Sequence, residues 1–229
     1  HQEVQALCDI YRQAPLLHAQ GTHVVSSDEK TGIQALERKH PTLPPRPGLD
    51  ERVEFEYIRH GTLCLMANWD VAQGRVREAT IGSTRTEPDF VAHIEATIDT
   101  DPSAGWVFVV DQLNTHMSEG LVGLVARRCD IDGDLGVKGR RGILSSMRSR
   151  KKFLADVSHR IRFVYTPRHC SWLNQVEIWF SILARRLLKR SSFSSLDELR
   201  DRLVSFIRYF NGVLAKPFKW TYTGRPLQA

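Results

Sequence analysis

Five consecutive apolar residues, W-V-F-V-V at positions 106–110, restrict the fold more than any other part of the sequence. A strand made only of apolar residues has no face for water, so both of its faces must be covered, as in sheets flanked by helices. The carboxylate of Asp111 follows this run directly. We therefore expect an α/β protein in which a buried strand ends at an aspartate.

The remaining segments predict strands and helices in mixed order. The strands are expected at 22–27 (ending at Asp28), 61–69, 75–81 and 161–165, and turn residues at 70–74 join two of them into a hairpin. The helices are expected at 87–98, 119–128, 172–190 and from Ser194 or Ser195 to a stop at Asn211-Gly212. Ser195 and Glu198 have the spacing of a capping box. Four prolines at 40–50 exclude a helix or a central strand there.

Composition excludes several classes of protein. Hydrophobic residues make up 41% and charged residues 25% of the 229 positions, which is typical of a globular chain with one large domain or two small ones. The four cysteines are far apart and form no C-x-x-C pair, so a zinc ribbon and a disulfide framework are not supported. The sequence shows no membrane-length apolar run and no signal-peptide pattern, and we expect a cytoplasmic protein.

Positive charge is concentrated in one stretch. The net charge is +6, yet the segment from Lys138 to Arg162 has nine basic residues and one acid, Asp156. A second cluster consists of Arg185, Arg186, Lys189 and Arg190. Such patches bind phosphate backbones by releasing counterions. The alternative is a solvated loop followed by favourable charges at a helix C-terminus.

Three carboxylates have positions that fit a metal site. Asp28 and Asp111 follow predicted strands, and Glu177 borders the apolar face of a predicted helix. Converging carboxylates hold hard cations such as Mg²⁺, and two ions about 3.5–4 Å apart can activate an attacking oxygen and stabilise a leaving one. Each acid alone also has a structural explanation: a turn cap for Asp28, a strand end for Asp111 and an ion pair with Arg186 for Glu177. The sequence lacks the motifs of a serine or cysteine hydrolase and of a phosphate-binding loop.

Three segments carry a family resemblance: S-S-D-E-K-T-G-I-Q-A-L-E-R (26–38), V-V-D-Q-L-N-T-H (109–116) and Y-T-P-R-H-C-S-W-L-N-Q-V-E-I-W-F-S-I-L (165–183). Two more segments, at 56–62 and 187–195, agree with it. Together they resemble the catalytic part of bacterial insertion-sequence transposases of the mariner-like superfamily, specifically the insertion-sequence 630 family with its D-D-E endonuclease domain. The resemblance spans positions 21 to 220.

The resemblance implies an RNase H-like fold, a mixed central sheet flanked by helices, with a basic glycine-rich insertion at about 132–160 before the last strand. Residues 21–212 would form the catalytic domain. Residues 1–20 would be a linker or the tail of a missing N-terminal DNA-binding region, and 213–229 a C-terminal tail. The insertion lengthens the spacing from Asp111 to Glu177, and Gln112 and Cys170 depart from the residues common in the family.

The resemblance also implies an activity. Asp28, Asp111 and Glu177 would be the catalytic residues and would bind two Mg²⁺ ions, or Mn²⁺ as a substitute. Water would cleave a strand at the transposon end, and the resulting 3′-hydroxyl would attack target DNA, with a T-A preference that suits an easily deformed step. The partners would be double-stranded DNA and a second copy of the chain, with no membrane, and the protein would lie at the nucleoid of a bacterial cytoplasm.

The predicted DNA-binding residues come from the basic stretches and from the neighbourhood of the acids. They are Lys138, Arg140, Arg141, Arg148, Arg150, Lys151, Lys152, His116, Trp172, Asn174, Arg185 and Arg186. For His116 and Asn174 the alternatives are a place around the metal or a structural hydrogen bond. Two other functions stay open: a non-catalytic DNA-binding or assembly module derived from a transposase, and a stand-alone RNase H-like nuclease.

Overall fold

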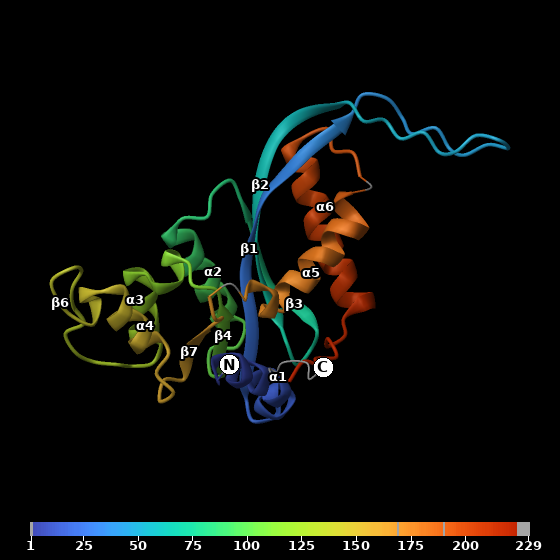
Figure 1. The fold of residues 1–229 in the computed structure, drawn as a ribbon. Helices are drawn as coiled ribbons and strands as arrows, with labels where there is room; N and C mark the ends of the chain where they lie inside the picture. The colour runs from blue at the N-terminus through green and yellow to red at the C-terminus, as the bar shows by residue number, and fades with distance from the viewer. Residues whose placement is uncertain (1, 169, 190, 224–229) are drawn as a thin grey trace.

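The computed structural model describes residues 2–168, 170–189 and 191–223, and its centre is a five-stranded sheet with the order β3-β2-β1-β4-β7 (Figure 1). The strands are β1 (Thr22–Arg38), β2 (Tyr57–Asp70), β3 (Arg75–Gly82), β4 (Gly105–Val110) and β7 (Ile161–Tyr165). β1, β2 and β3 pair antiparallel, whereas β4 is parallel to both β1 and β7. This mixed sheet is the architecture that the sequence predicted.

Helices cover both faces of the sheet (Figure 1). One face packs against α2 (Glu87–Asp99), α3 (Glu119–Arg128) and α4 (Met147–Leu154), and the other against α1 (Gln2–Ala19), α5 (Val176–Leu183) and α6 (Leu196–Tyr209). The side chains of β4 alternate between the two cores: Trp106 and Phe108 join the first, Val107 and Val109 the second. All of them are at most 2% exposed, which confirms a strand buried on both faces. Among the helices of the described residues, none has the length and apolar character needed to cross a membrane.

β1 differs from its predicted bounds. It was expected to end at residue 27, but it continues through Asp28 to Arg38 because β2 pairs with it over this whole length. The pairing register shifts between Lys30 and Ile33, where Gly32 has φ = +65°, a conformation that favours glycine. Asp28 therefore lies inside a paired strand, shortly before a bulge, rather than after the end of a strand.

The two C-terminal helices also differ from their predictions. The helix expected from residue 172 begins at Val176, after a 3₁₀ turn at Ser171–Leu173, and continues beyond Leu183 as a π-helical stretch, Ala184–Leu188. The expected stop at Asn211-Gly212 is also wrong, because a second π-helical stretch, Phe210–Leu214, follows α6. Arg190, expected in the basic cluster, lies outside the described residues.

The capping box expected at the start of α6 is only half formed. Ser195 accepts a hydrogen bond from the Glu198 amide at 3.0 Å, as predicted. The Glu198 carboxylate, however, accepts from the Ser194 amide at 2.8 Å, one residue before the N-cap.

The segments at the chain ends pack on the sheet. Helix α1 buries Leu7, Cys8 and Tyr11, and the Tyr11 hydroxyl donates a hydrogen bond of 2.8 Å to the carbonyl of Leu173. Near the other end, Phe218 stacks on Trp69 with a centroid distance of 4.4 Å. The domain boundaries expected at 20/21 and 212/213 stay predictions, although both flanking segments contact the main core.

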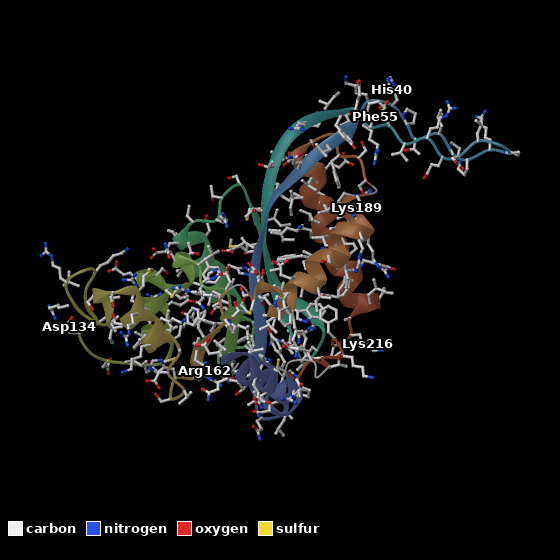
Figure 2. All side chains as sticks on the ribbon, in the orientation of Figure 1. His40, Phe55, Asp134, Arg162, Lys189 and Lys216 are labelled. Atoms are coloured by element: carbon white, nitrogen blue, oxygen red, sulfur yellow. The ribbon has the colours of Figure 1, made fainter. Side chains whose placement is uncertain are left out.

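Two segments project from the body. Residues 39–56, which contain the proline-rich stretch, extend the β1–β2 hairpin into a long arm with two isolated bridges, and His40 and Phe55 mark its base (Figure 2). On the opposite side, the basic insertion forms the small hairpin of β5 (Gly136–Val137) and β6 (Arg141–Gly142), then the 3₁₀ turn Ile143–Ser145 and α4. Its loop around Asp134 lies at the far edge of the molecule, whereas Leu144 and Leu154 anchor it in the core (Figure 2).

Candidate active site

Asp28 and Asp111 lie side by side on neighbouring parallel strands. The register of β1 and β4 pairs Ser26 with Val109, and its continuation by two residues places Asp28 level with Asp111. Asp28 is 7% exposed, and the side chain of Asp111 is 30% exposed. Two carboxylates thus meet at the end of β4, one buried and one open to solvent.

A set of buried hydrogen bonds connects the start of α5 to β1. The Asn174 amide nitrogen donates to the carbonyl of Ser27 at 2.9 Å and to Oδ2 of Asp28 at 3.0 Å. The Ser26 hydroxyl donates to Oδ1 of Asn174 and accepts from the amide of Val176 at 2.9 Å. Because Glu177 is the next residue, these bonds hold the first turn of α5, which carries it, against β1.

Burial and like charge act on Asp28 together. Burial raises the pKa of Asp28, and although the hydrogen bond from the Glu29 amide lowers it, the nearby Asp111 and Glu177 raise it further, to about 7. The like-charge effects indicate that Asp111 and Glu177 both lie within electrostatic reach of Asp28. A cation bound among them would remove this repulsion.

His116 forms a bridge between two carboxylates. Its Nδ1 lies 2.7 Å from Oδ1 of Asp111 and its Nε2 3.3 Å from Oε1 of Glu29, and the imidazole is fully buried. Burial alone would lower the pKa of His116, but the hydrogen bonds and charges of Asp111 and Glu29 raise it to about 9. For Asp111, burial would raise the pKa, but the His116 hydrogen bond and the Leu113 amide outweigh it, so the pKa is lowered. His116 therefore orients Asp111 and keeps it ionised.

The donor set fits hard divalent cations. Three carboxylates supply oxygen ligands of the kind that Mg²⁺ and Mn²⁺ prefer, and burial, followed by the charges of Asp111 and Glu177, raises the pKa of Asp28. In the described part of the chain, these acids are not among the groups of three whose donor atoms all lie within 4.8 Å of one another. Carboxylates separated by more than 4.8 Å can still hold a pair of ions, since the outer ligands of two ions about 4 Å apart can be separated by about 8 Å.

The predicted DNA-binding residues divide by exposure. The exposed ones are Lys138, Arg140, Arg141, Arg148, Lys152, Trp172, Arg185 and Arg186, and Lys151 is half-buried. Lys151 lies near the acids, because its Nζ is 3.4 Å from Oε1 of Gln112 and 4.8 Å from the ring centroid of Tyr165. Two of the exposed residues already have an acidic neighbour: Lys138 pairs with Glu119 and Arg141 with Asp134.

Three of the predicted DNA contacts are buried. Arg150 is 9% exposed, and its guanidinium donates to the carbonyls of Met117 at 2.7 Å and Leu144 at 3.0 Å, so it fastens α4 to the body. His116 and Asn174 are fully buried against Asp111 and Asp28. Arg150 is thus held in the core in this conformation, where it does not meet DNA. His116 and Asn174 bond to the carboxylates of Asp111 and Asp28, which fits both a place around the metal and a structural hydrogen bond, so their roles stay predictions. Asn174 also precedes α5, whose first residue is Val176.

Sequence reasoning missed three residues of the site. Ser26 ties β1 to α5, Glu29 holds the far side of His116, and Arg85 helps to lower the pKa of Asp111. Ser26 and Glu29 lie in the first motif, at 26–38, which marks their positions but does not show that they bond to α5 and His116. Arg85 lies in the loop between β3 and α2, and nothing in its local sequence marks it.

The sheet order, the helices on both faces and the acids at the end of the parallel strands define an RNase H-like catalytic fold. A family model described as "DDE superfamily endonuclease" matches residues 23–200. The chain belongs to the DDE superfamily of endonucleases.

Solved structures with this fold include the Mos1 mariner transposase. In its paired-end complex with Mn, the match covers 97% of this chain and 57% of the other, with 14% identity and a TM-score of 0.55. The match to the pre-cleavage Mos1 transpososome covers 95% of this chain and 59% of the other, with 13% identity and a TM-score of 0.56. The match to the isolated Mos1 catalytic domain covers 95% of this chain and 88% of the other, with 11% identity and a TM-score of 0.53. The chain thus spans less than two thirds of the longer Mos1 chains. Comparison with the curated proteins finds no match.

Proposed function

We propose that this chain is the catalytic domain of a DNA transposase, which cleaves DNA at transposon ends and joins the freed 3′-hydroxyl to target DNA, with a preference for T-A. The observation that supports it most is the convergence of Asp28, Asp111 and Glu177 in a DDE-family chain, two from parallel strands and one from a helix tied to β1. The membership in the insertion-sequence 630 family, and an action at the bacterial nucleoid, belong to the same proposal.

In the proposed mechanism the three acids hold two Mg²⁺ or Mn²⁺ ions. Bound there, the ions supply activation of the attacking oxygen and stabilisation of the leaving oxygen in an in-line displacement. Asn174 holds the Asp28 carboxylate, and His116 holds the Asp111 carboxylate. These contacts fix the acids before substrate arrives, and positioning accounts for much of the rate in phosphoryl transfer.

The proposed DNA surface comprises the exposed basic residues and Trp172. The side chain of Trp172 is 52% exposed two residues before Asn174, so its ring can stack on a base close to the acids. Lys151 bonds to Gln112, and Arg85 lines a pocket with Gln112 beside Asp111, so both would contact phosphates near the scissile bond.

The decisive experiment is cleavage and joining on a supercoiled plasmid with Mg²⁺, Mn²⁺ or EDTA. We expect metal-dependent nicking and T-A joining, abolished by each of Asp28→Ala, Asp111→Ala and Glu177→Ala. Glu95→Ala, at a half-exposed carboxylate of α2 that pairs with Arg128, is the matched control and should retain activity. Cleavage that survives Glu177→Ala would remove Glu177 from the site.

The same assay separates the alternatives. Cleavage confined to RNA-containing duplexes would identify a stand-alone RNase H-like nuclease. DNA binding without cleavage in either metal, also when end DNA and an upstream DNA-binding region are supplied, would identify a non-catalytic assembly module.

We also propose that the chain acts as a homodimer on DNA, with the arm at 39–56 as a contact. The arm leaves Leu43, Leu49, Val53 and Phe55 between 47% and 79% exposed, and such apolar surface is typical of interaction sites. Sedimentation on end DNA should show two copies. Replacing residues 41–54 by a short turn should reduce dimer formation and leave the melting temperature within a few degrees.

A further inference from the structure

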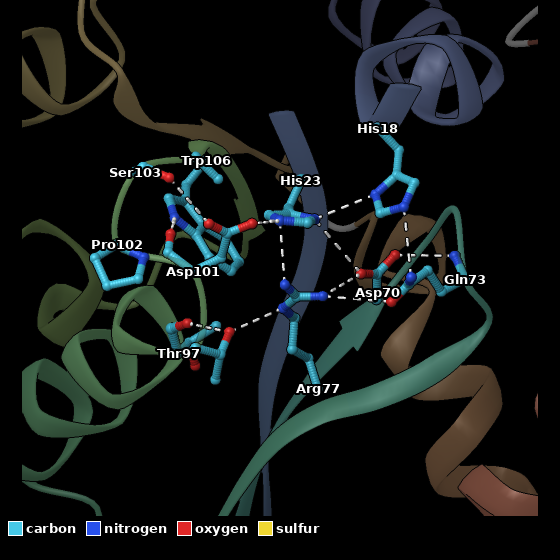
Figure 3. A network of polar contacts seen from close by, with 12 residues as sticks. His18, His23, Asp70, Gln73, Arg77, Thr97, Asp101, Pro102, Ser103 and Trp106 are labelled. Atoms are coloured by element: carbon cyan, nitrogen blue, oxygen red, sulfur yellow. Dashed lines mark hydrogen bonds and ion pairs between the residues drawn. The ribbon is translucent and has the colours of Figure 1, made fainter. Parts of the chain in front are cut away.

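A group of titratable side chains lies around the first residues of β1 (Figure 3). His18 comes from the last turn of α1, His23 from the start of β1 and Asp70 from the end of β2. We call these three residues the His-His-Asp cluster. His23 is five residues from Asp28, or about 17 Å along an extended strand, so the cluster is separate from the catalytic acids.

The donor atoms of the cluster converge. Nδ1 of His18 lies 3.2 Å from Nδ1 of His23, and Nδ1 of His23 lies 3.9 Å from Oδ2 of Asp70. Each of the three residues offers one ligand atom that lies within 4.8 Å of those of the other two. Asp70 is fully buried and His23 is 5% exposed, whereas His18 is half-buried and leaves a path to solvent.

Nε2 of His23 lies between an acidic and a basic neighbour. It is 2.9 Å from Oδ2 of Asp101, which accepts, and 3.1 Å from Nη2 of Arg77, which donates. When Nε2 donates its proton to Asp101, the lone pair of the neutral ring is on Nδ1, which faces His18 (Figure 3). A carboxylate behind a histidine is the arrangement that orients metal-binding imidazoles.

Two facing ring nitrogens 3.2 Å apart need either a hydrogen between them, in an N–H···N hydrogen bond, or a metal ion. The spacing fits an ion: a point equidistant from the three donor atoms lies about 2.0–2.4 Å from each, near the Zn–N and Zn–O distances of about 2.0–2.2 Å. The local charge also suits a cation, because two carboxylates, Asp70 and Asp101, face one guanidinium, Arg77, which leaves one negative charge in excess.

Arg77 shares the oxygen of Asp70 that faces the cluster. Its Nη1 lies 3.3 Å from Oδ2, while the guanidinium lies over the Trp106 ring at 5.2 Å. A carboxylate oxygen has two lone pairs, so one can accept from Arg77 while the other is directed to a cation.

We propose that the His-His-Asp cluster binds one Zn²⁺ ion through Nδ1 of His18, Nδ1 of His23 and Oδ2 of Asp70, with water in the fourth position. Two nitrogen ligands favour zinc over magnesium. The bound ion joins the end of α1 to β1 and β2, and so fastens this helix to the sheet. The proposal does not depend on the catalytic activity.

The test is a Zn²⁺ titration by calorimetry, with Co²⁺ absorption as a probe of ligand geometry. We expect one tight Zn²⁺ per chain, a higher melting temperature with Zn²⁺, and visible Co²⁺ bands of a four-coordinate site. His18→Ala should weaken Zn²⁺ binding by roughly 100-fold or more and abolish the temperature shift. His18 is the residue to change because it is half-buried at a helix end, so the variant should fold.

Two controls identify the site that binds. His60→Ala, at a half-buried histidine paired with Glu37, should bind Zn²⁺ like the unmodified chain. Asp28→Asn should also retain the tight Zn²⁺ site, because the catalytic acids are not its ligands. Zn²⁺ binding that survives His18→Ala and is lost in Asp28→Asn would overturn the proposal. So would a chain that binds no Zn²⁺, since the two histidines would then share a proton.

Discussion

Neighbouring residues can be equally buried and have opposite effects on stability, as Asn174 and Gln175 illustrate. Asn174 is fully buried, and its amide bonds to Ser26, Ser27 and Asp28. Gln175 is 1% exposed, yet neither polar atom of its amide has a hydrogen-bond partner among the described residues. An unpaired buried amide costs stability, whereas a paired one contributes to it.

We therefore expect opposite results from two adjacent substitutions. Asn174→Ala should lower the free energy of unfolding by about 2–3 kcal/mol, because it removes several buried hydrogen bonds. It should also reduce the cleavage rate at saturating DNA, since Asp28 loses a positioning partner. Gln175→Met should leave the unfolding free energy unchanged or raise it by about 1 kcal/mol. Urea denaturation and plasmid cleavage measure both, and equal losses in the two variants would contradict this interpretation of the site.

His93 should make the protein sensitive to acid. Its Nδ1 lies 2.8 Å from the Thr80 hydroxyl, and its Nε2 is buried without a partner in the part of the chain that the structure describes. Burial lowers the pKa of His93 from 6.5 to about 3. The unfolded chain therefore takes up a proton below pH 6.5 that the folded chain refuses. Stability from this group is full above pH 6.5 and falls toward pH 3, at up to about 1.4 kcal/mol per pH unit.

The measurement is the free energy of unfolding at several pH values between 4 and 7. His93→Gln has no titrating imidazole, so its free energy of unfolding should fall less steeply in this range. The difference in slope should be at most about 1.4 kcal/mol per pH unit, which corresponds to one proton. An unchanged slope in His93→Gln would show that another group causes the acid sensitivity.

At the scale of elements, local sequence patterns predicted correctly those helices and strands whose ends depend on local interactions. The bounds of α3 and β7 are those expected, and the apolar run at 106–110 is β4 without its first glycine. The errors lie where distant partners decide. β1 is long because β2 pairs with it past Asp28, and α5 starts late because Asn174 bonds to a residue 146 positions earlier in the chain. The positions of the three acids were predictable from motifs, but the roles of Ser26, Glu29 and Arg85 depend on contacts that no local pattern contains.

The turn between β2 and β3 depends on a glycine for two reasons. Gly74 has φ = +65°, and a Cβ there would lie 1.9 Å from the carbonyl carbon of Lys216 and 2.0 Å from the nitrogen of Pro217. The same turn accepts the Lys216 amide at 3.0 Å. Gly74 thus allows the C-terminal segment to cover Trp69.

Gly74→Ala should displace this segment and lower the melting temperature strongly, with increased solvent exposure of Trp69 in its fluorescence. Gly48→Ala is the matched control, because Gly48 has φ = +79° but no described atom lies within 4 Å of its Cβ position. It should cost only the backbone strain, about 1–2 kcal/mol at most. Equal effects of the two variants would show that the segment's contact with Gly74 contributes nothing.

At the scale of the whole molecule, charge and shape together determine how DNA could approach. The basic insertion lies on one side of the sheet, and Lys189 and Lys216 lie on the other (Figure 2). The positive residues of the insertion are mostly exposed, but Arg150 among them is part of the core. A count of charges along the sequence therefore overstates the number that can meet phosphate.

The salt dependence of DNA binding should distinguish basic residues that neutralise phosphates from a basic residue, such as Arg150, that stabilises the core. Arg148→Ala and Lys152→Ala should each reduce the slope of log K against log salt by about 0.9 if the side chain neutralises one phosphate. Arg150→Ala should leave this slope unchanged below its melting temperature, and should instead lower the unfolding free energy because two buried carbonyls lose their donor. A reduced slope in Arg150→Ala would show that α4 rearranges on DNA.

Burial of β4 on both faces has a consequence for genetics. In a library of random single substitutions selected for transposition, polar replacements at Trp106, Val107 and Phe108 should be depleted as completely as changes of Asp111. Survival alone would then not distinguish the buried strand from Asp111. Scoring the same library for protein abundance would divide it, because only variants at Asp111 should accumulate to normal levels while failing to transpose.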